Sequence, residues 1–184
     1  MGTDVDRGGQ GADRARSAGY VVRGARPADA AEIGRVHVQV WREAYAGLMP
    51  PDYLAALDPQ ASVARWTEIL AQPADGVRRL VGVAPAGEVV AIAAAGPSRD
   101  DDAPTPWELW AINVLAAHQG TGIADLLMEQ LVGVEPASLW VLRGNERAMR
   151  FYARHGFQPD GAVKFHEPTA TAEDRWVRCT ARSG

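Results

Sequence analysis

Hydrophobic and polar residues in the first third of the chain follow a helical period. Over residues 27–47, one flank repeats every four positions at Ile33, His37, Trp41 and Tyr45. Pro27 suits the first turn of such a helix and Gly47 suits its exit. The pattern also predicts a short strand over residues 20–26 and one or two further helices between residues 51 and 72.

From residue 77 onward, the helical period gives way to short apolar runs that are typical of strands. Residues 77–84 and 88–96 are two such runs joined by Pro-Ala-Gly, which predicts a hairpin. The remaining apolar runs predict strands at 107–115, 137–142, 157–167 and 174–181, with helices at 122–133 and 145–155. Strands that alternate with helices in this way indicate a single mixed α/β domain.

The first 19 residues have a different composition. They combine glycines with charges of both signs and have no apolar stretch of the kind that a signal peptide needs. We therefore expect a disordered leader over residues 1–19, followed by one domain over residues 20–184.

Composition and net charge limit the classes of binding partner and the cellular location to be expected. The chain is 47% hydrophobic and 23% charged, with a net charge of -4. These values indicate an ordinary globular protein, argue against nucleic acid as a partner and weakly favour a cationic small molecule. No uncharged apolar run approaches the ~18 residues of a membrane span. Cys179 is the only cysteine, so no intrachain disulfide can form and a cytoplasmic location is expected.

One loop points to chemistry. Gly120, Gly122 and Ala124 occupy alternate positions directly before the apolar helical run. The start of a helix has unpaired N–H groups and a partial positive charge, and small residues let a phosphate approach both. A simple tight turn at a helix start is the alternative. The loop lacks the lysine of a Walker motif, and its third small residue comes too early for the dinucleotide fingerprint.

Two sequence blocks carry a resemblance to a known family. Gln119, Gly122 and Ala124 fit the pattern Q-x-x-G-x-[G/A]. The second block, NERAMRFYARHGF, fits N-x-x-A-x-x-F-Y-x-x-x-G-F through Asn145, Ala148, Phe151, Tyr152, Gly156 and Phe157. The chain thus resembles the GNAT superfamily of acetyl-CoA-dependent N-acetyltransferases over residues 20–180, most closely over 107–160. The resemblance implies a mostly antiparallel sheet of six or seven strands, splayed at the cofactor site and flanked by about four helices.

The resemblance also implies how acetyl-CoA binds. Backbone groups of Ile112, Val114 and Leu115 would pair with the pantetheine arm. The cofactor's pyrophosphate would lie on the amides of Gln119, Gly120, Thr121, Gly122, Ile123 and Ala124, and the second block would contact the cofactor through Asn145, Ala148 and Tyr152. Thr121 stands where the family often has Lys or Arg, so we expect backbone donors rather than a cation to hold the phosphates. The four histidines are scattered, and no metal is expected.

Transfer of an acetyl group from sulfur to nitrogen needs proton management, because a free alkyl amine is protonated and a thiolate is a poorer leaving group than a thiol. The resemblance makes Tyr152 the candidate acid beside the thioester sulfur; the alternative is a core tyrosine that anchors its helix. Glu108, at the start of its strand, is the candidate base; the alternative is a solvated carboxylate at a strand edge.

The resemblance also implies that the acceptor faces the first helices, which form a wall of the acceptor site in the family. The flank of His37, Trp41 and Tyr45, together with Trp110, is the candidate substrate wall, although an aromatic stripe is more often part of a core. Aromatic faces and nearby carboxylates suit a cation. The resemblance therefore implies transfer of acetyl from acetyl-CoA to a primary amine of a small molecule or a peptide N-terminus, in a ternary complex. Dimerisation is common in the superfamily, so the resemblance, rather than the sequence itself, raises the expectation of a homodimer. A catalytically silent acyl-CoA-binding module is the alternative.

Overall fold

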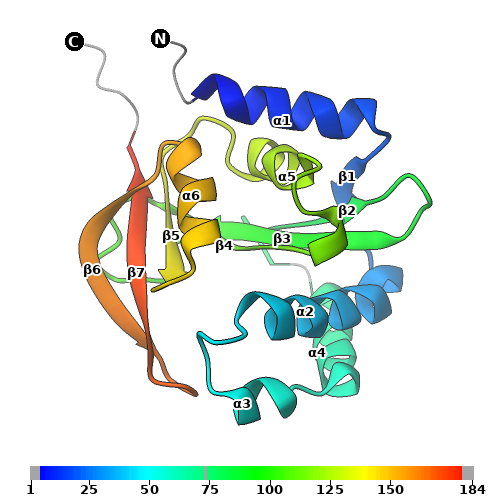
Figure 1. Cartoon of the computed structure of the whole chain (residues 1–184), viewed down its shortest axis with the longest axis horizontal. Helices are drawn as coiled ribbons and strands as arrows, with labels where there is room; N and C mark the ends of the chain where they lie inside the picture. The colour runs from blue at the N-terminus through cyan, green and yellow to red at the C-terminus, as the bar shows by residue number, and fades with distance from the viewer. Residues whose placement is uncertain (1–4, 73, 180–184) are drawn as a thin grey trace.

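The computed structural model describes residues 5–72 and 74–179. Its core is a seven-stranded sheet in the order β1-β2-β3-β4-β5-β7-β6 (Figure 1). All neighbouring strands are antiparallel except β4 and β5, which are parallel. The strands are β1 (Val21–Gly24), β2 (Arg78–Val83), β3 (Val89–Pro97), β4 (Trp107–Val114), β5 (Ala137–Leu142), β6 (Gln158–His166) and β7 (Thr171–Arg178).

Helices cover both faces of the sheet (Figure 1). On one face lie α2 (Ala30–Ala44), α3 (Pro51–Ala55) and α4 (Pro59–Ala71); on the other lie α1 (Val5–Ser17), α5 (Ile123–Leu131) and α6 (Glu146–Arg154). Short 3-10 turns at Pro27–Asp29 and Ala116–His118 lead into α2 and precede the loop before α5. The predicted single α/β domain with a mostly antiparallel sheet is confirmed.

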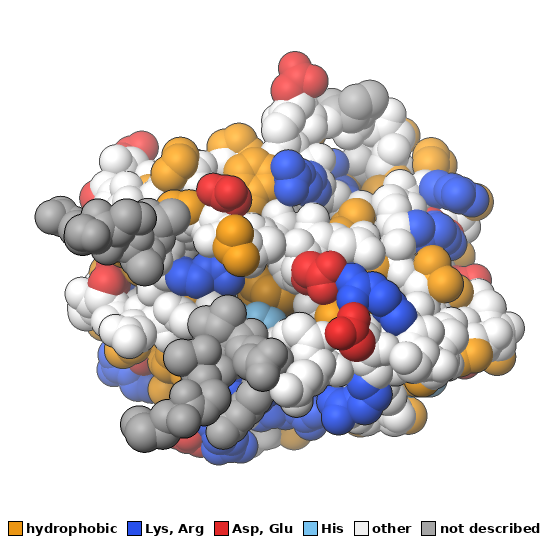
Figure 2. Space-filling model, turned by 90° about the horizontal axis from the view of Figure 1, so that it is seen from above, with side chains coloured by type: hydrophobic (Ala, Val, Ile, Leu, Met, Phe, Trp, Pro, Cys, Tyr) orange, Lys and Arg blue, Asp and Glu red, His pale blue; other side chains and the backbone are white. Residues whose placement is uncertain are grey.

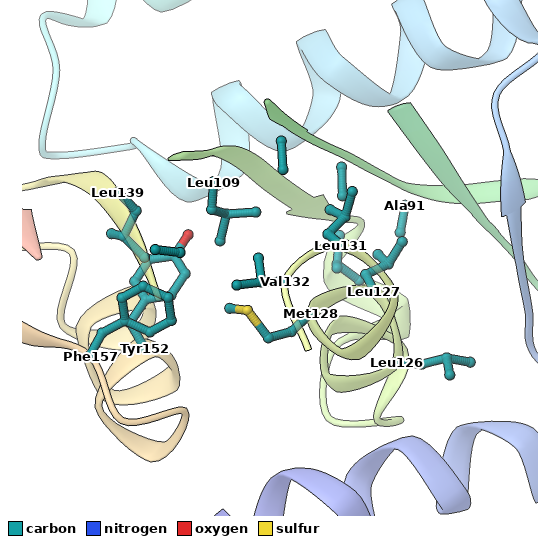
Figure 3. Close-up of a cluster of buried hydrophobic side chains, with 14 of the residues drawn as sticks. Ala91, Leu109, Leu126, Leu127, Met128, Leu131, Val132, Leu139, Tyr152 and Phe157 are labelled. Atoms are coloured by element: carbon teal, nitrogen blue, oxygen red, sulfur yellow. The ribbon is translucent and has the colours of Figure 1, made fainter. Parts of the chain in front are cut away.

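β3 lies at the centre of the core because it is apolar along its length and buried on both faces. Ala91, Ala93 and Ala95 face the cluster under α5, whereas Ile92 faces the cluster under α2. Figure 3 shows the first cluster, in which Ala91 lies near the leucines of α5 and the rings of Tyr152 and Phe157 lie at its far side. The core therefore connects the two helices whose sequence blocks predict cofactor binding.

The strands β4 and β5 separate after two residue pairs. They are paired only at Glu108↔Ser138 and Leu109↔Leu139. On its other edge, β4 shifts register against β3 at the next residue, since Leu109 pairs with Ala95 but Ala111 pairs with Ala94. The extra residue is Trp110, and a bulge of this kind bends its strand. The splayed sheet expected from the sequence is confirmed at this point.

The N-terminal residues correct one sequence prediction. Residues 5–17, expected to be a disordered leader, form helix α1. Ala12 and Ala15 are buried, 1% and 0% exposed, in the cluster that includes α5. Glycine weakens a helix in isolation, but packing against neighbours overrides that preference. The glycines and charges were therefore a misleading signal of disorder, and the described chain has six helices rather than about four.

Candidate active site

The gap between β4 and β5 opens into a cavity of about 510 Å³. Its floor is made of residues 110–114 of β4 and residues 140–142 of β5. Residues of α2 line one side, and the loop before α5 together with α6 lines the other. The cavity thus brings together residues of both sequence blocks and the aromatic flank of α2 where the sheet is splayed.

The loop before α5 is held open by glycine conformation and by side-chain bonds. Gly120 and Gly122 have φ angles of 78° and 96°, a region that L side chains rarely adopt. The Gln119 side-chain amide donates to the carbonyl of Val114 at 3.0 Å, which ties the loop to the end of β4. The Thr121 hydroxyl donates to the carbonyl of His118 at 2.7 Å. Neither bond uses a backbone N–H group of the loop, although the Gln119 amide donates to the Ala116 carbonyl at 3.2 Å.

The amides at this helix start have spare hydrogen-bonding capacity. Within the described residues, the N–H groups of Gly120, Gly122 and Ala124 donate to no protein acceptor, whereas that of Ile123 reaches the Thr121 hydroxyl at 3.4 Å. All three free amides belong to residues that line the cavity. Together with the positive end of α5, they form an arrangement suited to a phosphate group.

Most residues predicted to bind cofactor line this cavity: Ile112, Val114, Gln119, Gly120, Gly122, Ile123, Ala124, Asn145, Ala148 and Tyr152. Leu115 and Thr121 do not. The Leu115 amide donates to the Val90 carbonyl at 3.0 Å, so it is already used by the sheet. The Thr121 side chain turns back into its own loop. For these two residues, the placement gives no support to a cofactor contact.

Asn145 begins α6 as predicted. Its side-chain oxygen accepts a hydrogen bond from the Ala148 amide at 3.2 Å, which confirms its role as a helix cap. The cap fixes the start of the nine-residue helix that carries Tyr152. Both Asn145 and Ala148 line the cavity, so the cap and the predicted cofactor contact are compatible.

Tyr152 lies on the cavity wall and is 8% exposed. Its ring packs against Phe151 and Phe157, with centroids 5.4 and 6.1 Å away. Burial raises the pKa of Tyr152 well above the usual 10, and the nearby Tyr45 hydroxyl raises it further. The phenol therefore stays protonated at neutral pH and can donate a hydrogen bond into the cavity.

Glu108 lies elsewhere. Its side chain is 1% exposed, does not line the cavity and is bound by Arg99. The Arg99 amide donates to Oε2 at 2.9 Å, and the guanidinium binds Oε1. This carboxylate anchors the loop after β3 to β4. Its placement supports neither the predicted base nor the alternative of a solvated strand-edge carboxylate.

The four predicted acceptor residues lie together on the cavity wall: His37, Trp41, Tyr45 and Trp110. Trp41 contacts the Tyr45 ring edge-on at 5.1 Å and the His37 ring at 5.2 Å. Two lining residues in this half were missed, Trp140 on β5 and Glu173 on β7. The non-local pairing of β5 with β7 brings them to the cavity, and no local sequence signal marks them.

Burial keeps two side chains of this wall, His37 and Tyr45, uncharged at neutral pH. It lowers the pKa of His37 to about 4, assisted by the positive charge of Arg65. It also raises the pKa of Tyr45 to about 12, assisted by the negative charge of Glu173. At neutral pH, an incoming amine therefore meets an uncharged imidazole, an uncharged phenol and one carboxylate.

The depressed pKa of His37 predicts acid sensitivity. As the pH falls below about 6.5, His37 becomes protonated in the unfolded chain but stays neutral in the folded chain. The stabilisation present above pH 6.5 is therefore lost progressively down to about pH 4. Between pH 7 and pH 5, we expect the free energy of unfolding to fall by about 1–2 kcal/mol from this residue. Urea titrations at both pH values should show a flatter dependence for His37→Gln. An unchanged dependence would contradict the buried neutral imidazole.

Comparison with known proteins agrees with this geometry. The sequence model of the "Acetyltransferase (GNAT) family" matches residues 39–157. The chain belongs to the GNAT acetyltransferase family. It is 30% identical to the uncharacterized N-acetyltransferase Rv2669 of Mycobacterium tuberculosis, over 74% of this chain and 88% of that protein. It is 29% identical to the uncharacterized N-acetyltransferase YuaI of Bacillus subtilis, over 72% of this chain and 77% of that protein.

Solved GNAT structures share the fold. A GCN5-related N-acetyltransferase from Kribbella flavida superposes with a TM-score of 0.64 at 21% identity, covering 89% of this chain and 99% of that one. The PaiA N-acetyltransferase from Thermoplasma acidophilum, solved in complex with coenzyme A, gives a TM-score of 0.61 at 16% identity, covering 85% and 97%. The family and this fold support acetyl-CoA as the acyl donor, and the chain is an acetyltransferase.

The described residues contain no group of three or more His, Cys, Asp or Glu side chains that could hold a metal ion. Among the helices of residues 5–72 and 74–179, none has the length and apolar character needed to cross a membrane.

Proposed function

We propose that this acetyltransferase moves the acetyl group of acetyl-CoA onto a primary amine of a small cationic molecule, or onto a peptide N-terminus. The observation that carries the proposal is that one cavity is lined by the residues with free amides, by the aromatic side chains and carboxylate of the acceptor wall, and by Tyr152. In this arrangement, the phosphates would bind at the start of α5, the pantetheine arm would follow β4, and the amine would enter beside α2.

Direct attack in a ternary complex is the mechanism that the lining residues favour. No Ser, Thr, Cys or Lys is found among the described residues that line the cavity, and Cys179 lies exposed outside it. A covalent acetyl-enzyme on those nucleophiles therefore has no candidate residue there. The amine nitrogen would attack the thioester carbonyl, the C–S bond would break, and the thiolate of CoA would leave.

Tyr152 would stabilise that thiolate mainly by a hydrogen bond. A thiol has an ordinary pKa of about 8.5 and a phenol about 10, and burial raises the pKa of Tyr152 further. Complete proton transfer from the phenol to sulfur would be uphill. The proton that finally neutralises the sulfur can instead derive from the nitrogen, which becomes acidic when it bonds to the carbonyl carbon.

Glu173 would attract and orient the acceptor. It lines the cavity with a side chain that is 21% exposed, and the Nζ of Lys164 lies 3.8 Å from its carboxylate. Trp41 and Tyr45 line the same half, whereas Lys164 already lies over the Trp140 ring at 4.3 Å. A cationic acceptor would therefore share the Glu173 carboxylate with Lys164 and meet the rings of Trp41 and Tyr45. This pairing supports an acceptor with positive charge.

Glu173→Gln is expected to raise the KM for a diamine acceptor by about tenfold, because a partly desolvated charge pair contributes about 1–2 kcal/mol. The KM for acetyl-CoA should not change. Asp174→Asn is a matched control, since Asp174 is adjacent on β7 but does not line the cavity and pairs with Arg143. Equal KM values for the diamine in Glu173→Gln and in the wild type would contradict this assignment.

The function is tested by release of free thiol from acetyl-CoA with a panel of polyamines, aminoglycosides, amino acids and peptides. Activity with one class, with initial-velocity lines that intersect, supports direct transfer in a ternary complex. Binding of CoA without thiol release for any amine would favour the alternative, a silent acyl-CoA-binding module.

Two other expectations from the sequence stay predictions, a cytoplasmic location and a homodimer. The terminal strand β6 lies at the edge of the sheet and exposes 65% of Phe165. An exposed ring on an edge strand is compatible with self-association. Light scattering of the purified chain decides between monomer and dimer.

A further inference from the structure

Helix α1 lies directly over the start of α5 (Figure 1). Its buried side, Ala12 and Ala15, belongs to the same hydrophobic cluster as Leu126 and Leu127 of α5. This helix therefore reaches the end of the cavity that offers free amides. It also lies outside residues 39–157, the part of the chain that matches the family.

The contact between α1 and the glycine loop is made by backbone. A Cβ placed on Gly122 would overlap the carbonyl of Gly11, and a Cβ on Gly11 would overlap the carboxylate of Asp125. One turn earlier, a Cβ on Gly8 would come within 2.8 Å of the His155 ring, which itself bonds Asp125 at 2.9 Å. Because these glycines pack too closely for any side chain, the position of α1 is fixed relative to the first turn of α5.

Arg14 projects from α1 into the lining of the same cavity. Within the described residues, it forms no ion pair, whereas Arg16 on the same helix binds Glu129 and Asp13. The sequence from Leu115 through Glu129 contains no Lys or Arg. A cation for a diphosphate on this loop must therefore come from another element.

The face of the molecule that carries α1 has no extended basic patch in the view of Figure 2. In Figure 2, acidic and basic side chains lie next to one another on this face. A positive charge at the loop therefore has to come from an individual side chain such as Arg14. Arg147 and Arg154 of α6 also line the cavity, but Arg154 lies 3.9 Å from Asp125. Arg147 stands in the first turn of α6, at the opposite end from His155, the residue of that segment that lies against Gly8 of α1.

We propose that α1 is part of the cofactor site and that Arg14 binds the diphosphate of CoA, in place of a cation within the loop. This inference rests on the proposed function for the identity of the ligand. A guanidinium presents paired N–H donors that match two phosphate oxygens, and it stays charged at all relevant pH values. The loop amides and Arg14 would then hold the diphosphate from two sides.

The test is calorimetric titration of the full chain with CoA and with 3′-dephospho-CoA, which keeps the diphosphate. Arg14→Gln is expected to raise the dissociation constants of both ligands by about tenfold, the effect of losing one charged hydrogen bond. Arg16→Gln, on the same helix but bound to Glu129, is the control and should bind both ligands as the wild type does. The unliganded Tm of Arg14→Gln should equal that of the wild type, because the side chain is exposed.

Three results would overturn the inference. The first is that Arg14→Gln binds both ligands as the wild type does. The second is that Arg14→Gln weakens the binding of CoA but not of 3′-dephospho-CoA, which would place Arg14 at the 3′-phosphate. The third is that Arg16→Gln weakens binding as much as Arg14→Gln does. All three leave acetyl transfer by the wild-type protein intact, so they are distinct from a failure of the proposed function. That failure would be seen as wild-type protein that binds no CoA or releases no thiol with any amine.

Discussion

Tyr152→Phe is expected to lower kcat by about 100-fold or more while the dissociation constant of acetyl-CoA changes little. The substitution removes only the hydroxyl, and the ring keeps its contacts with Phe151 and Phe157. Since the hydroxyl faces a thiolate only when the C–S bond breaks, its loss raises the barrier without weakening the ground state. Stopped-flow or steady-state thiol release measures kcat, and calorimetry measures binding.

Tyr45→Phe is the matched control for this experiment. Tyr45 is partly buried, lines the same cavity and has a raised pKa. It lies at the end of α2, on the acceptor side, so its hydroxyl is expected to affect the acceptor KM rather than kcat. An equal fall of kcat in both variants, or wild-type turnover in Tyr152→Phe, would remove the assignment of Tyr152 to the sulfur.

Local patterns in the sequence were sufficient for most of the fold. The strand predicted at 137–142 has the observed bounds, and the predicted hairpin corresponds to β2 and β3. Each of these signals spans no more than twenty consecutive residues. The position of β7 between β5 and β6 depends instead on contacts between distant segments, and the sequence pattern does not contain it.

The same division holds for the active site. Gln119, Gly122 and Asn145 are recognisable because their roles are backbone geometry and capping, which local sequence dictates. Glu173 is not recognisable, because it reaches the cavity only through the pairing of β7 with β5. Arg14 was hidden for another reason: the helix that carries it is stabilised by packing rather than by its own propensity.

Glu108 shows how distance along a strand can mislead. Glu108 lies only two residues before Trp110, the first cavity-lining residue of β4, but β4 and β5 are still paired there, at Glu108↔Ser138. The splay begins only after Leu109, where the bulge at Trp110 bends the strand. A residue two positions before the bend is buried within the sheet, and its carboxylate needs the Arg99 partner that it has.

The second large effect is expected at Gly122. Gly122→Ala would place a methyl group against the Gly11 carbonyl in a backbone conformation of φ 96°. We expect the free energy of unfolding to fall by about 3 kcal/mol from the combination of strain and overpacking. We also expect weaker binding of CoA, because α1 must move away from the loop. Urea titration measures the first effect and calorimetry the second.

Gly120→Ala separates the two causes. Gly120 has a similar positive φ of 78°, but no atom lies within 4 Å of the position that its Cβ would take. Only the backbone strain of about 1 kcal/mol should remain. A larger loss of stability at Gly122 than at Gly120 therefore measures the contact between α1 and the loop. Equal losses at both glycines would mean that α1 does not press on the loop in solution, because the backbone strain alone would then account for both substitutions.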